Sequence, residues 1–476
     1  MTPGPGLDPE DWDAFRAAAH RLLDACIDRL ETAGDHPWQP VPDTVSSGYR
    51  VTAAGSDSET IATRLAAEVL PHGTGNTHPA FFGWVHGTGL AAGVMSEMVA
   101  ATMNANCGGR DHGAIHMERA VIDWARGVMG FPAGSSGLLV SGTSQATVIA
   151  LQAARIRALP DLRAAGPGAR RRTAYAGTGA QNAARKAMEL LGLGHGALRL
   201  IPEDARGLDP AALAAAIAAD RAAGAQPFAV IATAGSVDLG RFDDLNGLAD
   251  LCAAEGLWLH VDGAFGAWTR LAAPPWRGLS DGIGRADSLA CDFHKWMYVP
   301  YDCGLVLIRD AATHRAAFAA RPAYLAAQEA GLGGGDPWPC DYGIELSRGN
   351  RALKVWTALE LHGAAAFGAA ITRNCELAAL MGRLVQDHPA MALAAPVISN
   401  LCVFTLRPDL PPDQRSQLNS RAAQALQLSG DAVFSTTVID GTTCLRAAIA
   451  NHRTRARDVQ AAIDALAVAA GQLPEA

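Results

Sequence analysis

A lysine that follows a short apolar run is the first candidate for covalent chemistry in this chain. Lys295 lies directly behind the run Ser288–Asp292, in the sequence Asp-Phe-His-Lys-Trp. A lysine amine at the end of a strand can form a Schiff base with the aldehyde of a cofactor. The same pattern also fits a solvated surface lysine, so other residues must decide between the two interpretations.

A second group of residues is suited to binding an anion. Gly142, Thr143 and Ser144 follow the apolar run Leu138–Val140 and precede a predicted helix over Gln145–Leu159. Backbone N–H groups and hydroxyls at a helix N-terminus favour a phosphate. A plain helix cap is the alternative. The segment is not a Walker loop, because no Gly-Lys-Ser/Thr follows it.

Asp262 ends another apolar run, Leu257–Val261, among small residues that let a flat ring come close. A carboxylate there can keep the ring nitrogen of pyridoxal phosphate (PLP) protonated, which makes the ring an electron sink. Helix capping is the alternative role for Asp262. Lys295, Asp262 and the segment Gly142–Ser144 together fit one ligand, a phosphorylated aromatic aldehyde.

Short β-rich runs alternate with amphipathic helical segments between residues 137 and 310. This alternation predicts an α/β fold with a mostly parallel sheet and helices on both faces. Such sheets bind ligands at the carboxyl ends of their strands, where Lys295, Asp262 and Gly142 fall. The predicted strands are Leu138–Val140, Ala174–Ala176, Leu198–Ile201, Phe228–Ala232, Leu257–Val261 and Gly304–Ile308.

The segments on either side of this region predict two smaller units. Apolar positions at helical spacing from Pro9 to Ala33 indicate an N-terminal helical arm. A long helix is predicted from Arg351 through Leu361, and the helices and strands after it are typical of a small α+β domain. We therefore divide the chain into an arm (1–77), a large PLP-binding domain (78–350) and a C-terminal domain (351–476).

Composition and charge argue against several classes of protein. The net charge is −8 and the basic run Arg170–Arg172 is isolated, so no binding of nucleic acid is expected. No apolar stretch approaches the roughly 18 to 20 residues of a membrane span. Nine scattered cysteines without a Cys-x-x-Cys pair favour a reducing, cytoplasmic location. His112 and His116 share helical spacing but lack a zincin-type carboxylate, so no metal site is predicted.

Ordered motifs run along nearly the whole chain: His78–Gly83, Ser141–Ala146, Thr233–Ser236, His260–Asp262, His294–Trp296, Leu346–Trp356, Ser429–Asp431 and Thr443–Thr454. They resemble the motifs of the PLP-dependent amino-acid decarboxylases of the aromatic-L-amino-acid and glutamate decarboxylase superfamily. The resemblance implies a fold-type I enzyme with a seven-stranded-type sheet. It also implies a homodimer, in which the N-terminal arm wraps around the partner and the active site lies at the subunit interface.

The same resemblance implies roles for individual residues. Lys295 would hold PLP as a Schiff base, with Asp262 on the ring nitrogen and Gln181 covering the ring. Tyr342 would take the place of the loop tyrosine that protonates the quinonoid carbon, with structural packing as an equal alternative. The other expected cofactor contacts are Gly142, Thr143, Ser144, Ser236 and His294, and the expected substrate pocket is Phe81, Phe82, Trp84 and His86.

Gln181 departs from the family pattern, in which a histidine stacks on the cofactor ring. An amide cannot act as an imidazole acid or base. Relatives altered at this position or at the loop tyrosine can couple decarboxylation to oxidative deamination by O2. We therefore expect decarboxylation of an L-amino acid or amino-acid conjugate, with formation of an aldehyde, ammonia and CO2 as the alternative. A PLP lyase, an aminotransferase or a non-catalytic homologue is a further alternative.

Overall fold

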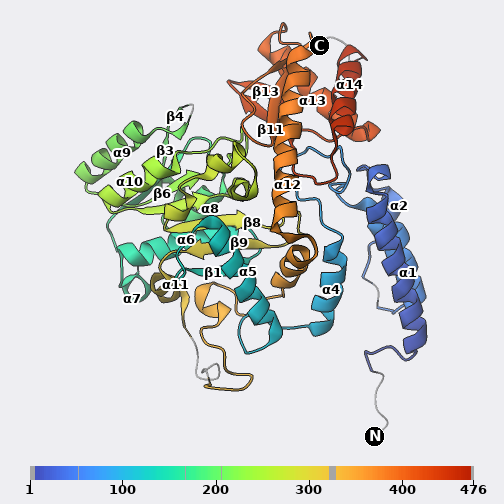
Figure 1. The fold of residues 1–476 in the computed structure, drawn as a ribbon, viewed down its shortest axis with the longest axis horizontal. Helices are drawn as coiled ribbons and strands as arrows, with labels where there is room; N and C mark the ends of the chain where they lie inside the picture. Colours follow the sequence, from blue (N-terminus) through green and yellow to red (C-terminus); the bar gives the residue numbers. More distant parts are fainter. Residues whose placement is uncertain (1–5, 52, 167, 205, 321–327, 473–476) are drawn as a thin grey trace.

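A computed structural model describes residues 6–51, 53–166, 168–204, 206–320 and 328–472. Its centre is a seven-stranded sheet with the strand order β1-β9-β8-β7-β6-β2-β3 (Figure 1). Strand β9 runs antiparallel to β1 and β8, and the other neighbours pair in parallel, which confirms the mostly parallel sheet. The strands are β1 (Ser136–Val140), β2 (Arg172–Gly177), β3 (Leu198–Ile201), β6 (Gln226–Thr233), β7 (Trp258–Asp262), β8 (Ser288–Asp292) and β9 (Gly304–Ile308).

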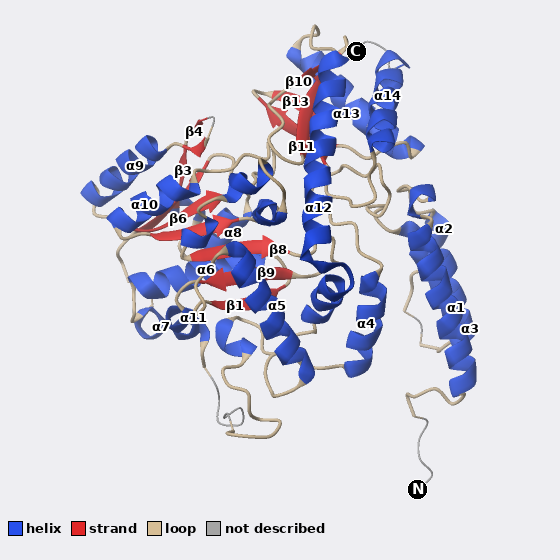
Figure 2. Cartoon of the chain, viewed as in Figure 1, coloured by secondary structure: helices blue, strands red, loops and turns tan. Residues whose placement is uncertain are grey.

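Helices cover both faces of this sheet (Figure 2). Successive residues of a strand point to opposite faces, so Leu139 of β1 packs into one core and Leu138 and Val140 into another. The core around Leu139 includes α5 (Gly113–Met129), α9 (Pro210–Ala222), α10 (Leu245–Glu255) and part of α12 (Ala352–Asp387). The other core includes α6 (Thr143–Ala158), α8 (Ala183–Leu190) and α11 (Ala311–Phe318).

A second sheet lies in the C-terminal part of the chain, as Figure 1 shows. It is antiparallel with the order β10-β11-β13-β12, and a separate apolar core joins it to α13 (Pro412–Ser429), α14 (Ala456–Gln472) and the distal part of α12. Helix α12 reaches this unit from the large sheet and is kinked at Gly363, where φ is 72°. The strands are β10 (Met391–Leu393), β11 (Leu401–Leu406), β12 (Ser435–Ile439) and β13 (Thr442–Ala448).

The N-terminal segment forms a helical arm at one side of the molecule (Figure 1). Helix α1 (Trp12–Glu31) is capped by Asp11, whose carboxylate accepts hydrogen bonds from the N–H groups of residues 13 and 14, and the helix packs against α3 (Ser58–Arg64). The remaining elements of the described chain are α2 (Asp43–Ser46), α4 (Ala92–Met103), α7 (Leu162–Ala165), β4 (Glu203–Asp204) and β5 (Gly207–Leu208), besides short 3-10 and π turns. Within the described ranges, no helix has both the length and the apolarity that a membrane crossing requires.

Candidate active site

A cavity of about 530 Å³ opens at the carboxyl ends of the central strands. Thr233 and Asp262 are register partners at the ends of β6 and β7, and Asp292 ends β8. Because β9 pairs with both β1 and β8, the segment after Val140 lies beside the segment after Asp292. The described lining residues are Trp84, Val85, His86, Ser141, Gly142, Thr143, Ser144, Gln181, Ala183, Thr233, Gly235, Val237, Asp262, Ala264, Phe265, Asp292, His294, Lys295 and Tyr301.

The amine of Lys295 lies in this cavity beside a buried carboxylate. Its Nζ is 2.9 Å from Oδ2 of Asp292, whose side chain is 2% exposed. Burial lowers the pKa of Lys295, but the carboxylates of Asp292 and Asp262 raise it by more, so the net shift is upward. The ion pair therefore fixes the position of the amine and keeps it protonated near neutral pH.

Asp262 is buried at the end of β7, where the backbone N–H of Ala264 donates to its Oδ1 (3.1 Å). Burial raises the pKa of Asp262, and the charge of Lys295 acts against this shift. A buried carboxylate is stabilised by a cationic partner. A protonated ring nitrogen would be such a partner, and the small side chain of Ala264 leaves room for a flat ring.

The N-terminus of α6 faces the same cavity. Gly142 precedes the helix, and Thr143 and Ser144 form its first turn. The hydroxyl of Thr143 is buried and has no hydrogen-bond partner among the described residues. A Cβ atom at Gly304 would lie 2.5 Å from the Cα of Gly142, so β9 can approach this turn only because residue 304 lacks a side chain. The helix terminus and the unpartnered hydroxyl are suited to a phosphate.

His294 adds a further donor beside this turn. The backbone N–H of Cys303 donates to its Nδ1 (3.1 Å), so the neutral ring carries its proton on Nε2. Burial lowers the pKa of His294, which favours this neutral form. The residues present therefore fit PLP, with the phosphate at α6 and His294, the ring nitrogen at Asp262 and the aldehyde near Lys295.

Most of the residues expected at the site line this one cavity: Gly142, Thr143, Ser144, Gln181, Asp262, His294, Lys295, Trp84 and His86. Oε1 of Gln181 accepts a hydrogen bond from the N–H of Ala183 at the start of α8. Ser236 lies directly behind the lining residue Gly235, and its hydroxyl accepts from the N–H of Arg241 (3.0 Å). Their individual roles stay predictions.

Phe82 and Tyr342 do not reach the cavity of this chain. The ring of Phe82 is buried against Phe434 (5.4 Å between centroids) in the core of the C-terminal sheet. Tyr342 ends a 3-10 turn, and its ring is tilted against that of His314 (4.9 Å between centroids), whose Nε2 lies 2.7 Å from the carbonyl oxygen of Tyr342. Tyr342 was expected either to act as the proton-donating loop tyrosine or to have a packing role, and its contacts in this chain match the packing role. The other loop tyrosine, Tyr324, lies outside the described residues.

Two further residues on the cavity escaped the sequence analysis, Asp292 and Tyr301. Oδ1 of Asp292 accepts from the N–H of Thr143 (2.7 Å) while its Oδ2 pairs with Lys295. The three-residue spacing to Lys295 was a usable signal, because one turn brings such residues together. Tyr301 lies with its ring 4.5 Å from that of His294, and no local pattern indicated it.

Aromatic rings form one wall of the cavity: Trp84 and His86 line it, whereas Phe81, which was expected in the substrate pocket, lies against them and is not among its described lining residues. The ring centroids of Phe81, Trp84 and His86 are 5.6 to 6.2 Å apart. Trp84 has a φ of 50°, and its carbonyl oxygen accepts from Nη1 of Arg446 (3.0 Å), which holds this backbone conformation. A Cβ at Gly87 would lie 1.8 Å from the carbonyl oxygen of His294, so the wall and the lysine segment touch through their backbones.

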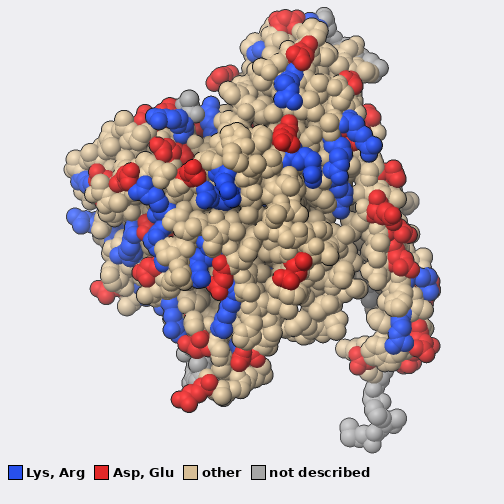
Figure 3. Space-filling model, in the orientation of Figure 1, with Lys and Arg blue, Asp and Glu red and all other residues tan. Residues whose placement is uncertain are grey.

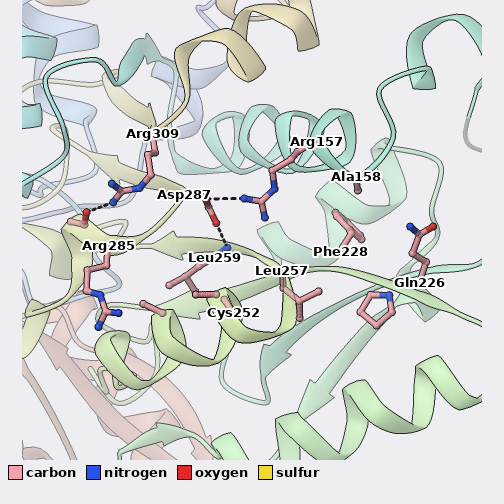
Figure 4. Close-up of a pocket in the computed structure, with 15 residues that line it drawn as sticks. Arg157, Ala158, Gln226, Phe228, Cys252, Leu257, Leu259, Arg285, Asp287 and Arg309 are labelled. Atoms are coloured by element: carbon pink, nitrogen blue, oxygen red, sulfur yellow. Dashed lines mark hydrogen bonds and ion pairs between the residues drawn. The ribbon is translucent and has the colours of Figure 1, made fainter.

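A larger cavity of about 780 Å³ lies at the opposite edge of the sheet, near the amino ends of β6, β7 and β8 (Figure 4). Arg157, Arg285 and Arg309 line it. Arg157 pairs with Asp287 (2.9 Å), Arg285 pairs with Asp250, and Arg309 donates to two backbone carbonyls. Each arginine thus has a partner within the protein, and we assign no chemistry to this cavity.

His112 and His116 do not converge as metal ligands. Nε2 of His112 lies 3.2 Å from the carbonyl oxygen of Asn106, and Nε2 of His116 lies 2.8 Å from Oδ1 of Asp111. Across the described part of the chain, no group of three or more His, Cys, Asp or Glu residues is placed to hold a metal ion.

The sequence matches one protein family over most of its length. The family described as "Pyridoxal-dependent decarboxylase conserved domain" matches residues 51–407. The chain is 30% identical to an aromatic-L-amino-acid decarboxylase of Bacillus atrophaeus over 457 residues, covering 94% of this chain and 93% of the relative. It is 28% identical to phenylacetaldehyde synthase of Arabidopsis thaliana over 483 residues, covering 96% of each.

The structure is similar to solved structures along the whole chain. A crystal structure of Oryza sativa TDC with PLP and tryptamine superposes with a TM-score of 0.89 at 25% identity, covering 98% of this chain and 99% of that one. This similarity confirms the expected fold-type I architecture, with its seven-stranded sheet and smaller C-terminal sheet.

Proposed function

The chain belongs to the pyridoxal-dependent decarboxylase family. From this premise we propose the role of each residue in its active site. Its reaction is the PLP-dependent decarboxylation of an amino acid. One observation supports these roles: Lys295, Asp262 and the N-terminus of α6 line a single cavity. When bound, PLP supplies an electron sink for the electrons left at Cα when CO2 departs.

Lys295 would attach the cofactor and later release it to the substrate amine. Its amine must lose a proton before it can attack an aldehyde, and Asp292, 2.9 Å away, is the nearest described carboxylate that stabilises the proton. Asp262 would keep the ring nitrogen protonated from its buried position at the end of β7. The first turn of α6 and Nε2–H of His294 would bind the phosphate.

The attachment site can be tested directly, because the sequence contains three lysines. Lys186 is exposed on α8, and the buried Lys354 pairs with Glu97 (2.8 Å). Borohydride reduction of the PLP-loaded protein, followed by peptide mapping, should place the phosphopyridoxyl group on Lys295. Lys295→Ala should lose the cofactor absorbance band and CO2 release, whereas Lys186→Ala should keep both. Label on another lysine would contradict the assignment.

The reaction itself is tested by measuring CO2 and identifying products by mass spectrometry after incubation with a panel of L-amino acids and cysteine conjugates. We expect release of the α-carboxylate from at least one of them, with no release from the Lys295→Ala protein. Products that all retain the carboxylate would contradict decarboxylation and would favour a lyase or an aminotransferase.

Gln181 supports a second candidate, decarboxylation coupled to oxidative deamination by O2. The side chain lines the cavity, and its carbonyl oxygen accepts a hydrogen bond from the N–H of Ala183, so an amide is present where the family pattern has a histidine. A relative that is 28% identical is a phenylacetaldehyde synthase. In air, this candidate predicts an aldehyde and ammonia together with O2 consumption. Gln181→His should then raise the fraction of amine, while an amine as the only product of the unaltered protein would exclude the candidate.

A homodimer is the assembly that we propose, supported by an apolar face on α4. Met95, Met98, Val99 and Met103 are each between 42% and 60% exposed on this helix. Figure 3 shows few charged side chains over α4 and the adjoining part of α12. An uncovered apolar face of this kind is typical of a protein interface. The arm helix α1 also exposes Trp12, Phe15 and Ile27.

The cysteines support a reducing compartment such as the cytosol. None of the nine forms a disulfide, and seven of them are buried in the described structure. Buried, unpaired thiols are characteristic of proteins that stay in a reducing environment. Trapping of free thiols in protein freshly isolated from cells should label all nine after denaturation.

A further inference from the structure

A second cavity adjoins the first at the aromatic wall. It has a volume of about 370 Å³ and shares Trp84 and His86 with the cavity of Lys295. Its other described lining residues come from three separate segments of the chain: Trp38, Thr74, Phe81, Gln427 and Val433. Both volumes lie within the range of about 300 to 1,000 Å³ that is usual for small-molecule sites.

The two cavities differ in charge. Lys295, Asp262, Asp292 and His294 line the first cavity, whereas no described residue on the second is an Asp, Glu, Lys or Arg. The polar groups of Thr74 and Gln427 have partners, because the Thr74 hydroxyl donates to Asn76 (2.6 Å) and the Gln427 amide donates to the carbonyl of Phe434 (3.0 Å). The second cavity is therefore suited to an uncharged, apolar group.

His86 lies where the two cavities meet, and it has an unused polar atom. Its Nδ1 is buried and makes no hydrogen bond within the described structure. The ring is held between Phe81 (5.7 Å, stacked) and the edge of Tyr301 (6.1 Å). A buried nitrogen without a partner is unfavourable, and a ligand atom that hydrogen-bonds to it removes this cost.

The geometry also fixes the wall between the cavities. Arg446 donates through Nη1 to the carbonyl of Trp84 (3.0 Å) and through Nε to the carbonyl of Val237 (2.7 Å), and Val237 lines the first cavity. These hydrogen bonds hold the backbone of Trp84, although the residue as a whole is 52% exposed. The half-exposed indole lines both cavities and so lies where they join.

From these contacts we propose that the substrate is an L-amino acid whose side chain carries a polar linking atom and, beyond it, an uncharged aryl or branched alkyl group. The linking atom is an acceptor such as an ether oxygen, to which Nδ1–H of His86 donates a hydrogen bond, and the apolar group occupies the second cavity. This inference rests on the proposed function, since it places the α-carboxylate and amine at Lys295. Loss of CO2 from Cα leaves this side chain unchanged.

Three probe compounds separate the parts of the proposal: O-benzyl-L-serine, O-methyl-L-serine and 2-amino-5-phenylpentanoic acid, in which carbon replaces the ether oxygen. With the PLP-loaded enzyme, kcat/KM for CO2 release should be at least tenfold higher for the benzyl ether than for the methyl ether. Loss of the oxygen should cost roughly fivefold, about the value of one neutral hydrogen bond. His86→Phe should remove this preference for oxygen.

Filling the second cavity provides the structural control. Val433→Trp and Thr74→Trp enter from different segments, so either should lower kcat/KM for the benzyl ether at least tenfold more than for the methyl ether. Val438→Trp, at a position that is 63% exposed on β12, should change neither. Thermal unfolding of each variant shows whether it is folded.

Equal kcat/KM for the benzyl and methyl ethers would overturn the proposal and leave decarboxylation intact. The same holds if none of the probes releases CO2 while another amino acid of the panel does. If no amino acid releases CO2 although PLP is bound through Lys295, the proposed function itself fails.

Discussion

One carboxylate, that of Asp292, contacts both the lysine and the phosphate turn. It pairs with Nζ of Lys295 (2.9 Å) and accepts from the N–H of Thr143 (2.7 Å), and its own side chain is almost fully buried. A buried carboxylate that bonds both a cation and a helix N-terminus fixes the position of each relative to the other. Asp292 is therefore the neighbour that contributes most to keeping the lysine protonated, with a smaller contribution from Asp262.

Asp292→Asn should make Lys295 easier to deprotonate. The carboxylate raises the pKa of Lys295, so its removal lowers that pKa and increases the neutral amine at a given pH. The rate of covalent PLP attachment, followed by stopped-flow absorbance, should reach its half-maximal value at a lower pH than in the unaltered protein. A pH profile that does not move would show that Asp292 does not control the lysine.

Asp262→Asn should separate cofactor attachment from catalysis. Lys295 is unchanged in this variant, so PLP should still attach, but an amide cannot keep the ring nitrogen protonated. CO2 release should fall by about 100-fold or more, the usual scale for loss of one electrostatic contact at a reacting centre. Asp244→Asn, at the exposed start of α10, is the control. An Asp262→Asn enzyme with unchanged kcat would remove Asp262 from the mechanism.

Short-range patterns identified most of the site, and tertiary contacts explain the omissions. Lys295, Asp262 and Gly142 follow apolar runs, and parallel strands bring such positions to one edge. Tyr342 could not be placed from sequence, because its packing on His314 depends on a turn that docks from elsewhere in the chain. Tyr301 joins the site through a ring contact with His294, for which the sequence has no periodic signal.

At the scale of the elements, a buried ion pair joins α5 to the segment before α12. Arg348 and Glu118 are both nearly unexposed, with 2.6 Å between Nη2 and Oε1. The carboxylate also accepts from the N–H of Leu139 in β1 (3.1 Å), and Arg348 donates to the carbonyl of Cys107 (2.6 Å). The pair thus links a helix, a strand and two connecting segments behind the phosphate turn.

Arg348→Leu should destabilise the fold strongly, because it leaves the carboxylate of Glu118 buried without its cation. We expect a loss of about 3 to 5 kcal/mol in the free energy of unfolding, measured by urea denaturation. The double variant Glu118→Leu with Arg348→Leu should lose less than the single one. An equal or larger loss in the double variant would mean that the charges themselves are not the source of the effect.

Met98→Glu tests the apolar face of α4. A charge at this exposed position would have to be buried if two copies pack there, so sedimentation should shift from dimer to monomer. Val468→Glu, at an exposed position of α14, should leave the assembly unchanged. A dimer that survives Met98→Glu would place the interface elsewhere.

Sequence periodicity predicted the helices less completely than the strands. The predicted helix from Arg351 through Leu361 ends close to Gly363, where α12 kinks, but the structure continues the helix to Asp387. A single glycine with positive φ interrupts the pattern without ending the packing of the second half against the C-terminal sheet. The extent of a kinked helix depends on such distant contacts, which local spacing does not contain.

For the whole molecule, buried histidines govern the response to acid. Burial lowers the pKa of His260, His314 and His452 to about 3, so these rings are neutral in the folded chain. The unfolded chain binds their protons below about pH 6.5, which favours unfolding as the pH falls. Asp243 acts in the opposite direction, because burial raises its pKa to about 6 and the folded chain then holds the extra proton.

Between pH 6 and 4 these four groups leave the unfolded chain with a net excess of about two protons. These four groups should therefore contribute a fall of about 3 kcal/mol per unit of pH to the free energy of unfolding, measured by urea denaturation. His452→Phe, which keeps a ring in place, should reduce this slope by about half. A slope that stays the same in this variant would mean that His452 is protonated in the folded protein.

The strand order also determines when the parts of the site can come together during translation. Strand β9 is the last strand of the large sheet along the chain, yet it lies between β1 and β8 and pairs with both. A nascent chain therefore cannot bring Gly142 beside Lys295 until residue 308 has emerged, whatever has already folded. The second cavity closes later still, since one of its walls is Val433. Translation arrested between codons 308 and 433 would therefore leave a chain that contains every strand of the large sheet but lacks one wall of the second cavity.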